Sequence, residues 1–385
     1  MPVLKKLLYI ALVIGGLLPL KVTAQQLDST RNKRFDNLQA EAKWFGGFLW
    51  AHSPTVSYLQ RQHTQAFEVT VSKPISGKRH WHTFYKHAVV GVSFLHYNLG
   101  YKGVLGTANG IYGFNRFNIA GNRGAHLRFS LGSGIGYLSK TFDKDDNHKN
   151  VTIGSHFNAL VNFQLLFEQC ITPRLFFNTG IGITHFSNGA FRTPNLGLNL
   201  PAVTAGLLYR FQPAPTPTLY PKSQFQPNKQ FIYSIIATVG RKEIYPPDGK
   251  GYFVNGLMFN ITKAIGIKSG LTLTFEAFND RSIKTVMERN NPQVQPSYYQ
   301  TIRPGIAFGY DLWLGKLSFL FQAGVYPYTF YKGDGNIYSR IGWRYRLPYG
   351  LLVNLTLKTH FAKADCIEFG VGYTLFNRHR VMRLL

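Results

Sequence analysis

Acidic residues, cysteines and long apolar runs are all scarce in this sequence, and each scarcity excludes a class of protein. Two cysteines, Cys170 and Cys366, are too few for a disulfide scaffold. An oxidising compartment would allow one bridge between them, although isolated cysteines in apolar strands are more often small core residues. The scattered histidines show no metal-binding spacing, and we predict no metal and no other cofactor.

The longest apolar run lies near the N-terminus, from Leu7 to Leu20. A transmembrane helix needs roughly 20 apolar residues, and no later segment offers them, so we expect no transmembrane helix. Lys5 and Lys6 precede the run, and Val22-Thr23-Ala24 follows it. This order is typical of a secretory signal peptide. It predicts a signal peptide over residues 1–24 and an exported chain that starts at Gln25.

The shortage of acidic residues makes the chain strongly basic. Asp and Glu number 17 against 43 Lys and Arg, which gives a formal net charge of +26. Such a charge suits nucleic acid, an anionic membrane surface or a phosphorylated glycolipid, and export leads us to expect no nucleic-acid partner. Two interpretations remain open: a positive outer surface that binds the phosphates and acidic sugars of lipopolysaccharide, or basic loops that keep the chain soluble in transit.

Aromatic residues and glycine are abundant, with 31 Phe, 22 Tyr and 38 Gly. This composition is typical of short strands with aromatic girdles and tight turns. Between His156 and Glu168 the residues alternate: those of one parity, at every second position, are all apolar, and those of the other parity are mostly polar. Such runs last about 12 residues, which matches the ~9 to 11 residues of a strand that crosses a bilayer and exceeds the ~5 to 6 of globular sheets. We therefore predict an all-β fold, an antiparallel transmembrane β-barrel.

A Pro-rich stretch, residues 213–230, divides the chain and reads as a linker. About eight strands fit before it, within residues 25–212, and about eight fit after it, within residues 231–376. A short basic tail, residues 377–385, follows. Two architectures remain open: two tandem barrels of eight strands, or one larger barrel of about 16 strands.

The two halves end on similar aromatic segments, residues 206–211 and 372–376. Both segments resemble the C-terminal signal of outer-membrane barrels, which favours two barrels. The pairing of residues 43–50 distinguishes the architectures, because pairing with 199–211 means two barrels and pairing with 366–376 means one.

The most informative chemistry lies between Thr184 and Gly197. His185 and Ser187 are two residues apart, so on a strand they share one face. A serine nucleophile needs such a neighbouring general base, because an unassisted hydroxyl reacts poorly at neutral pH. The pair shares the parity of the apolar residues, which places it on the lipid side of the wall, where Asn199 on the next strand is also expected.

This segment resembles the signature of the lipid A 3-O-deacylase (acyloxyacyl hydrolase) family, in which His-x-Ser-Asn is followed by Pro-Asn-x-Gly. His185, Ser187, Asn188, Pro194, Asn195 and Gly197 match it in order and spacing. The resemblance implies an outer-membrane serine esterase that acts on lipid A of lipopolysaccharide without a cofactor. Ser187 would be the nucleophile and His185 its base. Asn195, Asn188 and Gly189 would supply the oxyanion donors.

The chain departs from the family pattern at Asn199, where the family has the Glu that orients the histidine. An amide can accept a hydrogen bond from the imidazole, as Asn does in papain-like enzymes, but it cannot stabilise the imidazolium by charge. Glu168 is the nearest acidic residue on a neighbouring strand, but its parity points into the lumen. The alternative function is therefore a non-catalytic barrel of the Gram-negative outer membrane: a pore, a binding or structural protein, or a degenerate deacylase. A homodimer is a further possibility.

The second half contains an echo of the motif, Thr359-His360-Phe361-Ala362. Ala362 stands where the serine would be needed, and His360 falls on the lumen parity. We therefore predict that this half is non-catalytic. Asp365 and Glu368 follow closely, and exposed turn carboxylates are the ordinary interpretation of such residues.

Overall fold

The structure, a computed structural model, describes residues 37–75, 82, 84, 85, 88–122, 124–212, 231–247, 249–361 and 363–376. The predicted signal peptide, the linker 213–230 and the tail 377–385 lie outside the described residues. Among the described residues, no helix is long and apolar enough to cross a membrane.

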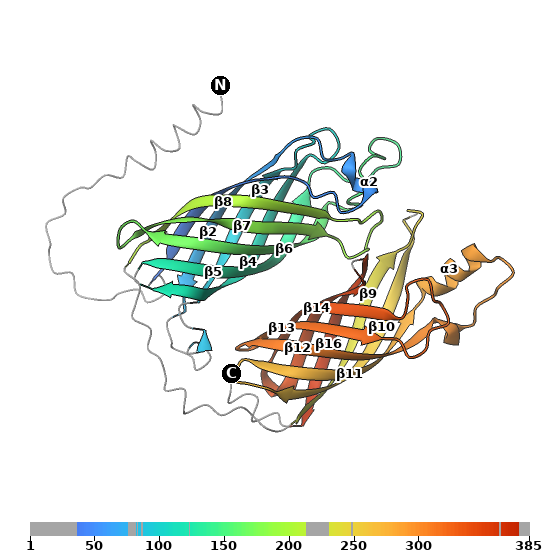
Figure 1. Cartoon of the computed structure of the whole chain (residues 1–385). Coiled ribbons are helices and arrows are strands. Elements are labelled where there is room, and N and C mark those ends of the chain that lie inside the picture. Colours follow the sequence, from blue (N-terminus) through green and yellow to red (C-terminus); the bar gives the residue numbers. More distant parts are fainter. Residues whose placement is uncertain are drawn as a thin grey trace. The chain divides into compact units, whose positions relative to one another are not determined.

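Eight antiparallel strands close into a barrel in the first half of the chain (Figure 1). They are β1 (Gln39–Gly47), β2 (Thr64–Pro74), β3 (Val89–Asn98), β4 (Thr107–Asn122), β5 (Ala125–Leu138), β6 (Phe157–Cys170), β7 (Leu175–Ser187) and β8 (Leu198–Arg210). The barrel closes because β1 pairs with β8, from Gln39 opposite Arg210 to Gly47 opposite Ala202. One short helix, α2 (Pro54–Ser57), lies in the loop between β1 and β2.

The second half forms another closed barrel of eight strands. They are β9 (Phe231–Glu243), β10 (Gly251–Ala264), β11 (Ser269–Asp280), β12 (Ile302–Leu314), β13 (Leu317–Val325), β14 (Ile337–Arg346), β15 (Leu351–His360) and β16 (Lys363–Phe376), with α3 (Ser282–Asn290) and the 3-10 turns η3 (Tyr298–Thr301) and η4 (Pro348–Gly350) between them. Closure is by β16 on β9. The predicted all-β antiparallel barrel fold is confirmed, and the pairing of β1 with β8 selects two barrels over one of 16 strands.

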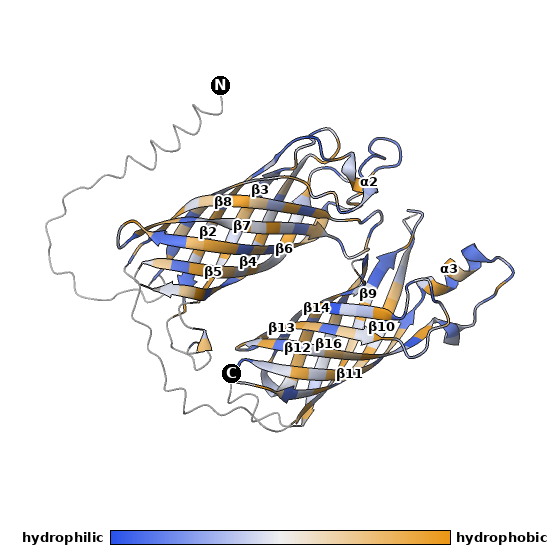
Figure 2. Cartoon of the chain, viewed as in Figure 1, coloured by the Kyte–Doolittle hydropathy of each residue, from blue (hydrophilic) through white to orange (hydrophobic). Residues whose placement is uncertain are grey.

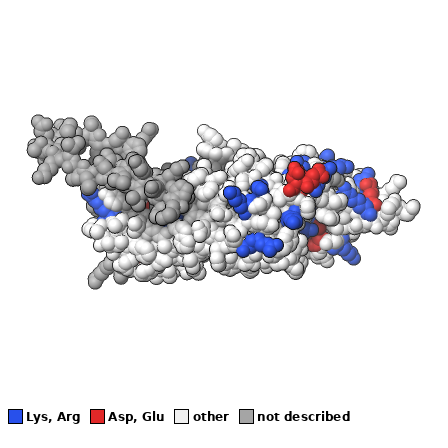
Figure 3. All heavy atoms as spheres, turned by 90° about the horizontal axis from the view of Figure 1, so that it is seen from above, with Lys and Arg blue, Asp and Glu red and all other residues white. Residues whose placement is uncertain are grey.

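Apolar side chains cover the outside of each wall, and polar side chains point inward. On β2 the exposed residues are Phe67, Val69 and Val71, whereas Glu68 and Thr70 between them are fully buried. Figure 2 shows this as alternating hydrophilic and hydrophobic bands along the strands. On the face drawn in Figure 3, acidic and basic residues gather in a few groups, and much of the described surface between them carries no charge. Alternation with the apolar face outward is the arrangement of a wall that faces lipid.

Charged side chains fill one half of the first barrel's lumen. Arg116 contacts Glu41 (Nη2 to Oε2, 2.8 Å) and Glu168 (Nη1 to Oε1, 3.2 Å), and Arg128 Nε lies 2.6 Å from Glu168 Oε2. These side chains are all buried, and Glu168 points inward as its parity predicted. Because each carboxylate contacts a cation, the network offsets the cost of removing these charges from water.

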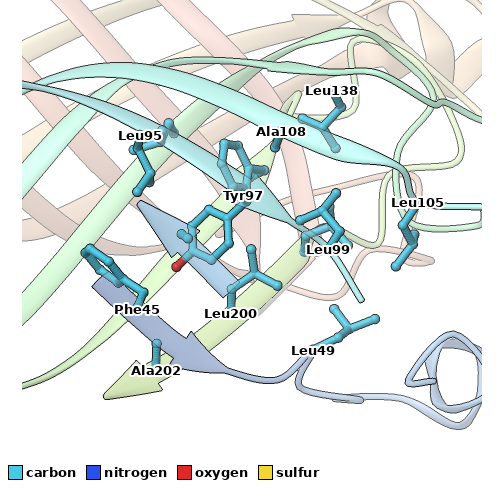
Figure 4. Close-up of a cluster of buried hydrophobic side chains, with 14 of the residues drawn as sticks. Phe45, Leu49, Leu95, Tyr97, Leu99, Leu105, Ala108, Leu138, Leu200 and Ala202 are labelled. Atoms are coloured by element: carbon cyan, nitrogen blue, oxygen red, sulfur yellow. The ribbon is translucent and has the colours of Figure 1, made fainter. Parts of the chain in front are cut away.

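Apolar side chains fill the other half of the lumen (Figure 4). Phe45, Tyr97, Leu200 and Phe186 are among the buried members of this cluster. It lies toward the strand ends that carry loops 48–63, 99–106, 139–156 and 188–197. With both halves of the lumen packed by buried side chains, the outer wall is the accessible surface of this barrel.

The second barrel also encloses paired charges. Arg340 Nη2 lies 2.9 Å from Glu276 Oε2, and its Nε lies 2.6 Å from Glu368 Oε2. Lys242 Nζ lies 2.5 Å from Asp365 Oδ1. The interpretation of Asp365 and Glu368 as exposed turn carboxylates is therefore wrong, because β16 begins at residue 363 and both side chains are buried. The two residues have opposite parity, and the register between β15 and β16 shifts at Asp365, since Thr359 pairs with Ala364 and Lys358 with Cys366. Both cysteines are free, Cys366 buried and Cys170 half-buried.

The network around Glu168 leads to a stability prediction. Replacing Glu168 by Ala leaves Arg116 and Arg128 without their shared carboxylate inside the lumen, which should cost about 3 to 5 kcal/mol of unfolding free energy. Urea titration of the protein in lipid vesicles, followed by tryptophan fluorescence, measures this loss. Gln169→Ala, on the outward face of the same strand, is the control and should change the midpoint little; equal midpoints for both variants would contradict the prediction.

Candidate active site

The predicted pair, His185 and Ser187, lies at the loop end of β7 and on its outward face. Ile181, four residues before His185, is strongly exposed on that same face. Thr184 and Phe186 point into the packed lumen. The strand thus places the pair as its parity predicted. Ser187 is nevertheless buried and His185 is half-buried. The loop after β7 contributes to this burial, with Asn195 against Ser187 and Gly197 against the His185 ring.

This loop, residues 188–197, is held by the side chain of Asn188. Its Nδ2 donates to Ser155 Oγ (2.9 Å) and to the carbonyl of Arg192 (3.0 Å), and its Oδ1 accepts from the Arg192 backbone N–H (3.4 Å). Gly189, with φ of +62°, allows the backbone to turn sharply directly after the strand. The Asn188 side chain therefore fixes the loop and does not point at Ser187.

Two N–H donors converge on Ser187 Oγ. The side-chain Nδ2 of Asn195 lies 2.9 Å away and the backbone N of Gly189 lies 3.3 Å away. The amide of Asn195 is itself oriented, because its Oδ1 accepts from the backbone N–H of Asn188 at 3.0 Å. These donors point at the serine oxygen itself, and they become available to the oxyanion of an ester only when that oxygen turns away.

The imidazole of His185 is held from the neighbouring strand. His185 and Asn199 are directly opposite in the β7–β8 register, and His185 Nδ1 lies 2.7 Å from Asn199 Oδ1. An amide oxygen can only accept, so Nδ1 carries the proton and Nε2 is left with its lone pair. In the described part of the chain no hydrogen bond joins His185 to Ser187; the Ser187 hydroxyl instead lies 3.3 Å from Asn195 Oδ1.

Gly197 lies against the edge of the His185 ring. It has φ of +79°, and a Cβ at this position would come within 2.8 Å of His185 Cε1. Its N–H donates to the carbonyl of Thr152 at 2.9 Å, which anchors the end of the loop. The glycine therefore leaves the room that the imidazole occupies.

His52 is a site residue that the sequence analysis missed. Its Nδ1 lies 3.2 Å from Asn199 Nδ2. The chain continues past β1 along the edge of β8, where Trp50 N donates to Asn199 O at 2.9 Å. The signal was present in the sequence, because the outward parity of β1 continues through Phe48 and Trp50 to residue 52.

An apolar groove of about 530 Å³ lies on the same outer wall. Among its lining residues are Ile181 and Ile183 of β7, Pro201 and Val203 of β8, and Gly46 at the end of β1. Ile183 and Pro201 are paired two residues before the His185–Asn199 pair, so the groove begins next to the imidazole. Gly46 lies opposite Val203, and the Trp44 ring packs over it.

The second barrel holds its echo histidine differently. His360 is buried in the lumen, where its Nε2 lies 3.0 Å from the hydroxyl of Tyr326. The inward direction agrees with its parity, and Ala362 lies outside the described residues. Within the ranges that the structure describes, no cluster of three or more His, Cys, Asp or Glu could hold a metal ion.

Comparisons with solved structures find distant barrels. Neisserial surface protein A is 11% identical (TM-score 0.31), and the match covers 45% of this chain and 97% of that protein. A mutant porin of Rh. blastica is 8% identical (TM-score 0.19), and the β domain of the Bordetella autotransporter BrkA is 9% identical (TM-score 0.23). Each covers 88% of this chain, with 99% of the porin and 98% of the β domain matched. We draw nothing further from these similarities. No curated protein matches the chain.

Two family models match, one on each barrel. The model described as lipid A 3-O-deacylase (PagL) matches residues 65–207, and the model described as acyloxyacyl hydrolase, C-terminal domain, matches residues 231–378. The first match contains the His185–Ser187 site, in agreement with the resemblance of its motif. The chain therefore belongs to the lipid A 3-O-deacylase (PagL) family of outer-membrane β-barrels.

Proposed function

We propose that this protein is a serine esterase that removes an ester-linked acyl chain from lipid A in the outer membrane. Membership of the family supports lipid A deacylation. The serine mechanism is supported by one observation above all. Ser187 Oγ, two N–H donors and an imidazole with a free Nε2 lie together on the outward face of an apolar wall.

The reaction requires Ser187 to turn from Asn195 toward His185. Nε2 of His185 then accepts the hydroxyl proton while Oγ attacks the ester carbonyl, and the resulting oxyanion accepts hydrogen bonds from Asn195 Nδ2 and the Gly189 N–H. When the intermediate collapses, the bond between the acyl carbon and the sugar oxygen breaks, and the imidazolium gives its proton to that oxygen, which leaves as a hydroxyl and leaves an acyl-serine. Water, deprotonated by His185, hydrolyses the acyl-serine and releases the fatty acid. Catalytic contacts often tighten only when substrate binds.

The groove beside the site fits the apolar part of the substrate. An acyl chain in it would lie against the isoleucines of β7 and the Pro201 and Val203 side chains of β8, with its ester end at His185 and Ser187. The basic composition of the chain suits the lipid A phosphates. Export by residues 1–24, the role of Asn188 as an oxyanion donor and a homodimer stay predictions.

The alternative of a pore is disfavoured for the first barrel by its packed lumen. Its charged half and its apolar half are both filled by buried side chains. A degenerate deacylase remains the rival, because Asn199 replaces the family's acidic residue. The predictions that follow separate the rival from the esterase.

We expect Ser187→Ala to abolish acyl release, with a loss of at least about 1,000-fold in kcat, because no nucleophile remains. Mass spectrometry of lipid A incubated with the purified protein measures it. Ser57→Ala, an exposed serine of the loop between β1 and β2, is the control and should keep full activity. Unchanged deacylation by the Ser187 variant would contradict the proposed function.

Asn199→Glu should raise kcat by about tenfold, because a carboxylate stabilises the imidazolium by charge as well as by a hydrogen bond, and ~1.4 kcal/mol corresponds to a factor of ten. Asn199→Ala should lower it, since the imidazole loses its Nδ1 partner. Single-turnover rates of acyl release compare the three proteins. A Glu variant that is slower than the natural protein would contradict the idea that Asn199 orients His185 but gives it no charge stabilisation.

Gly197→Ala should lower kcat by about tenfold or more with little change in KM, because its methyl group would displace the His185 ring and its φ is unfavourable for alanine. Gly103→Ala is the matched control, since a Cβ there lies 3.6 Å from its nearest neighbour, the Tyr101 ring. Full activity in the Gly197 variant would mean that the imidazole does not need the observed position.

A further inference from the structure

The residue that orients the catalytic histidine is an amide, and an amide has two chemically different ends. With Oδ1 of Asn199 toward His185, the ring carries its proton on Nδ1 and keeps Nε2 free to act as a base. With Nδ2 toward His185, Nδ1 must accept and Nε2 must carry the proton, so the ring cannot deprotonate Ser187. Both arrangements make one good hydrogen bond. Asn199 alone therefore does not select the active tautomer of His185.

A second partner of the Asn199 amide breaks this symmetry. His52 Nδ1 lies 3.2 Å from Asn199 Nδ2, on the side of the amide away from His185. An imidazole nitrogen with a free lone pair can accept from the amide N–H₂ but gives nothing to the amide oxygen. With the His52 proton on Nε2, the arrangement therefore favours Nδ2 toward His52 and Oδ1 toward His185.

The backbone places His52 at this position. Trp50 N donates to Asn199 O at 2.9 Å, so the segment after β1 is joined to the residue that His52 contacts. The carbonyl of Trp50 accepts the backbone N–H of His52 at 3.0 Å and also lies 3.3 Å from its Nδ1. Nδ1 can serve only one of these two partners, because the Trp50 carbonyl requires a proton on it and Asn199 Nδ2 requires its lone pair. The contact to Asn199 is the shorter of the two, and it corresponds to a His52 ring that carries its proton on Nε2.

We propose that His52 is a positioning residue for the esterase reaction: by accepting from Asn199 Nδ2 it fixes the amide so that His185 takes its active tautomer. This inference rests on the proposed function. It makes the contribution of His52 conditional on an amide at residue 199. A carboxylate presents an acceptor oxygen whichever way it is turned, so a Glu at that position would not need His52.

A double-mutant cycle tests this dependence. We expect His52→Ala to lower kcat roughly three- to tenfold with KM nearly unchanged, because part of the population adopts the inactive tautomer, and to cost less than about twofold when Asn199→Glu is also present. His52→Gln, which restores an acceptor, should recover most of the activity. His63→Ala, an exposed histidine of the same loop, is the matched control and should behave as the natural protein.

The tautomer itself can be measured without turnover. In ¹⁵N-histidine-labelled Ser187→Ala protein, the ring signals of His185 are those, among the 12 histidines, that vanish in the His185→Gln variant. We expect these signals to report a proton on Nδ1, and we expect the Nδ1-protonated fraction to fall when His52 is replaced by Ala.

The inference is overturned if His52→Ala leaves kcat and the His185 tautomer unchanged. It is also overturned if the loss of kcat is equal with Asn and with Glu at residue 199, since His52 would then act on something other than the amide. These outcomes differ from a failure of the proposed function, which would appear as deacylation by Ser187→Ala. Heat-modifiable mobility in gel electrophoresis confirms that each variant contains a folded barrel.

Discussion

Closure of β8 on β1 is the constraint on which the rest of the first barrel depends. In a bilayer no water is available to pair with a free backbone N–H or carbonyl, so a sheet that spans it must have no open edge. The register from Gln39–Arg210 to Gly47–Ala202 meets this requirement. Closure also divides the residues into two sets, since every second side chain must face lipid and the others must fill a narrow lumen.

The pairing of β8 with β1 also brings the residues of the proposed site together. β8 lies between β7 and β1, so Asn199 has His185 on one side and the continuation of β1 on the other. The hydrogen bond from Trp50 to Asn199 extends the β1–β8 pairing beyond the strand and brings His52 to the amide. The lumen is packed with side chains, and the proposed site lies on the outer wall, next to the apolar groove on the same face.

The alternation of polar and apolar residues along each strand allowed the direction of most side chains to be predicted from the sequence. Parity alone indicated that His185, Ser187 and Asn199 face outward and that Glu168 and His360 face inward. The strands place these residues so, although Ser187 is buried despite its outward direction. Contacts between residues distant in the chain could not be predicted this way. The sequence left one barrel or two open because strand pairing is non-local. It missed His52 because the outward parity of residue 52 does not reveal that its partner is Asn199, 147 residues away. Asp365 was misplaced because β16 begins earlier than its apolar residues suggest and because its register with β15 shifts at this residue.

An acidic residue beside the catalytic histidine both orients the imidazole and stabilises its positive charge, whereas Asn199 can do only the first. Orientation of the imidazole can be supplied by a fixed amide, but charge cannot. In the proposed mechanism the imidazolium then has the oxyanion as its counter-charge, held by Asn195 and Gly189 a few ångströms from Ser187. A neutral residue also costs less to keep on a wall that faces lipid than an ionised one. The site therefore relies more on its oxyanion donors than a site with an acid would. Its main requirement becomes the orientation of two amides: the backbone of residue 188 orients Asn195, and in our proposal His52 orients Asn199.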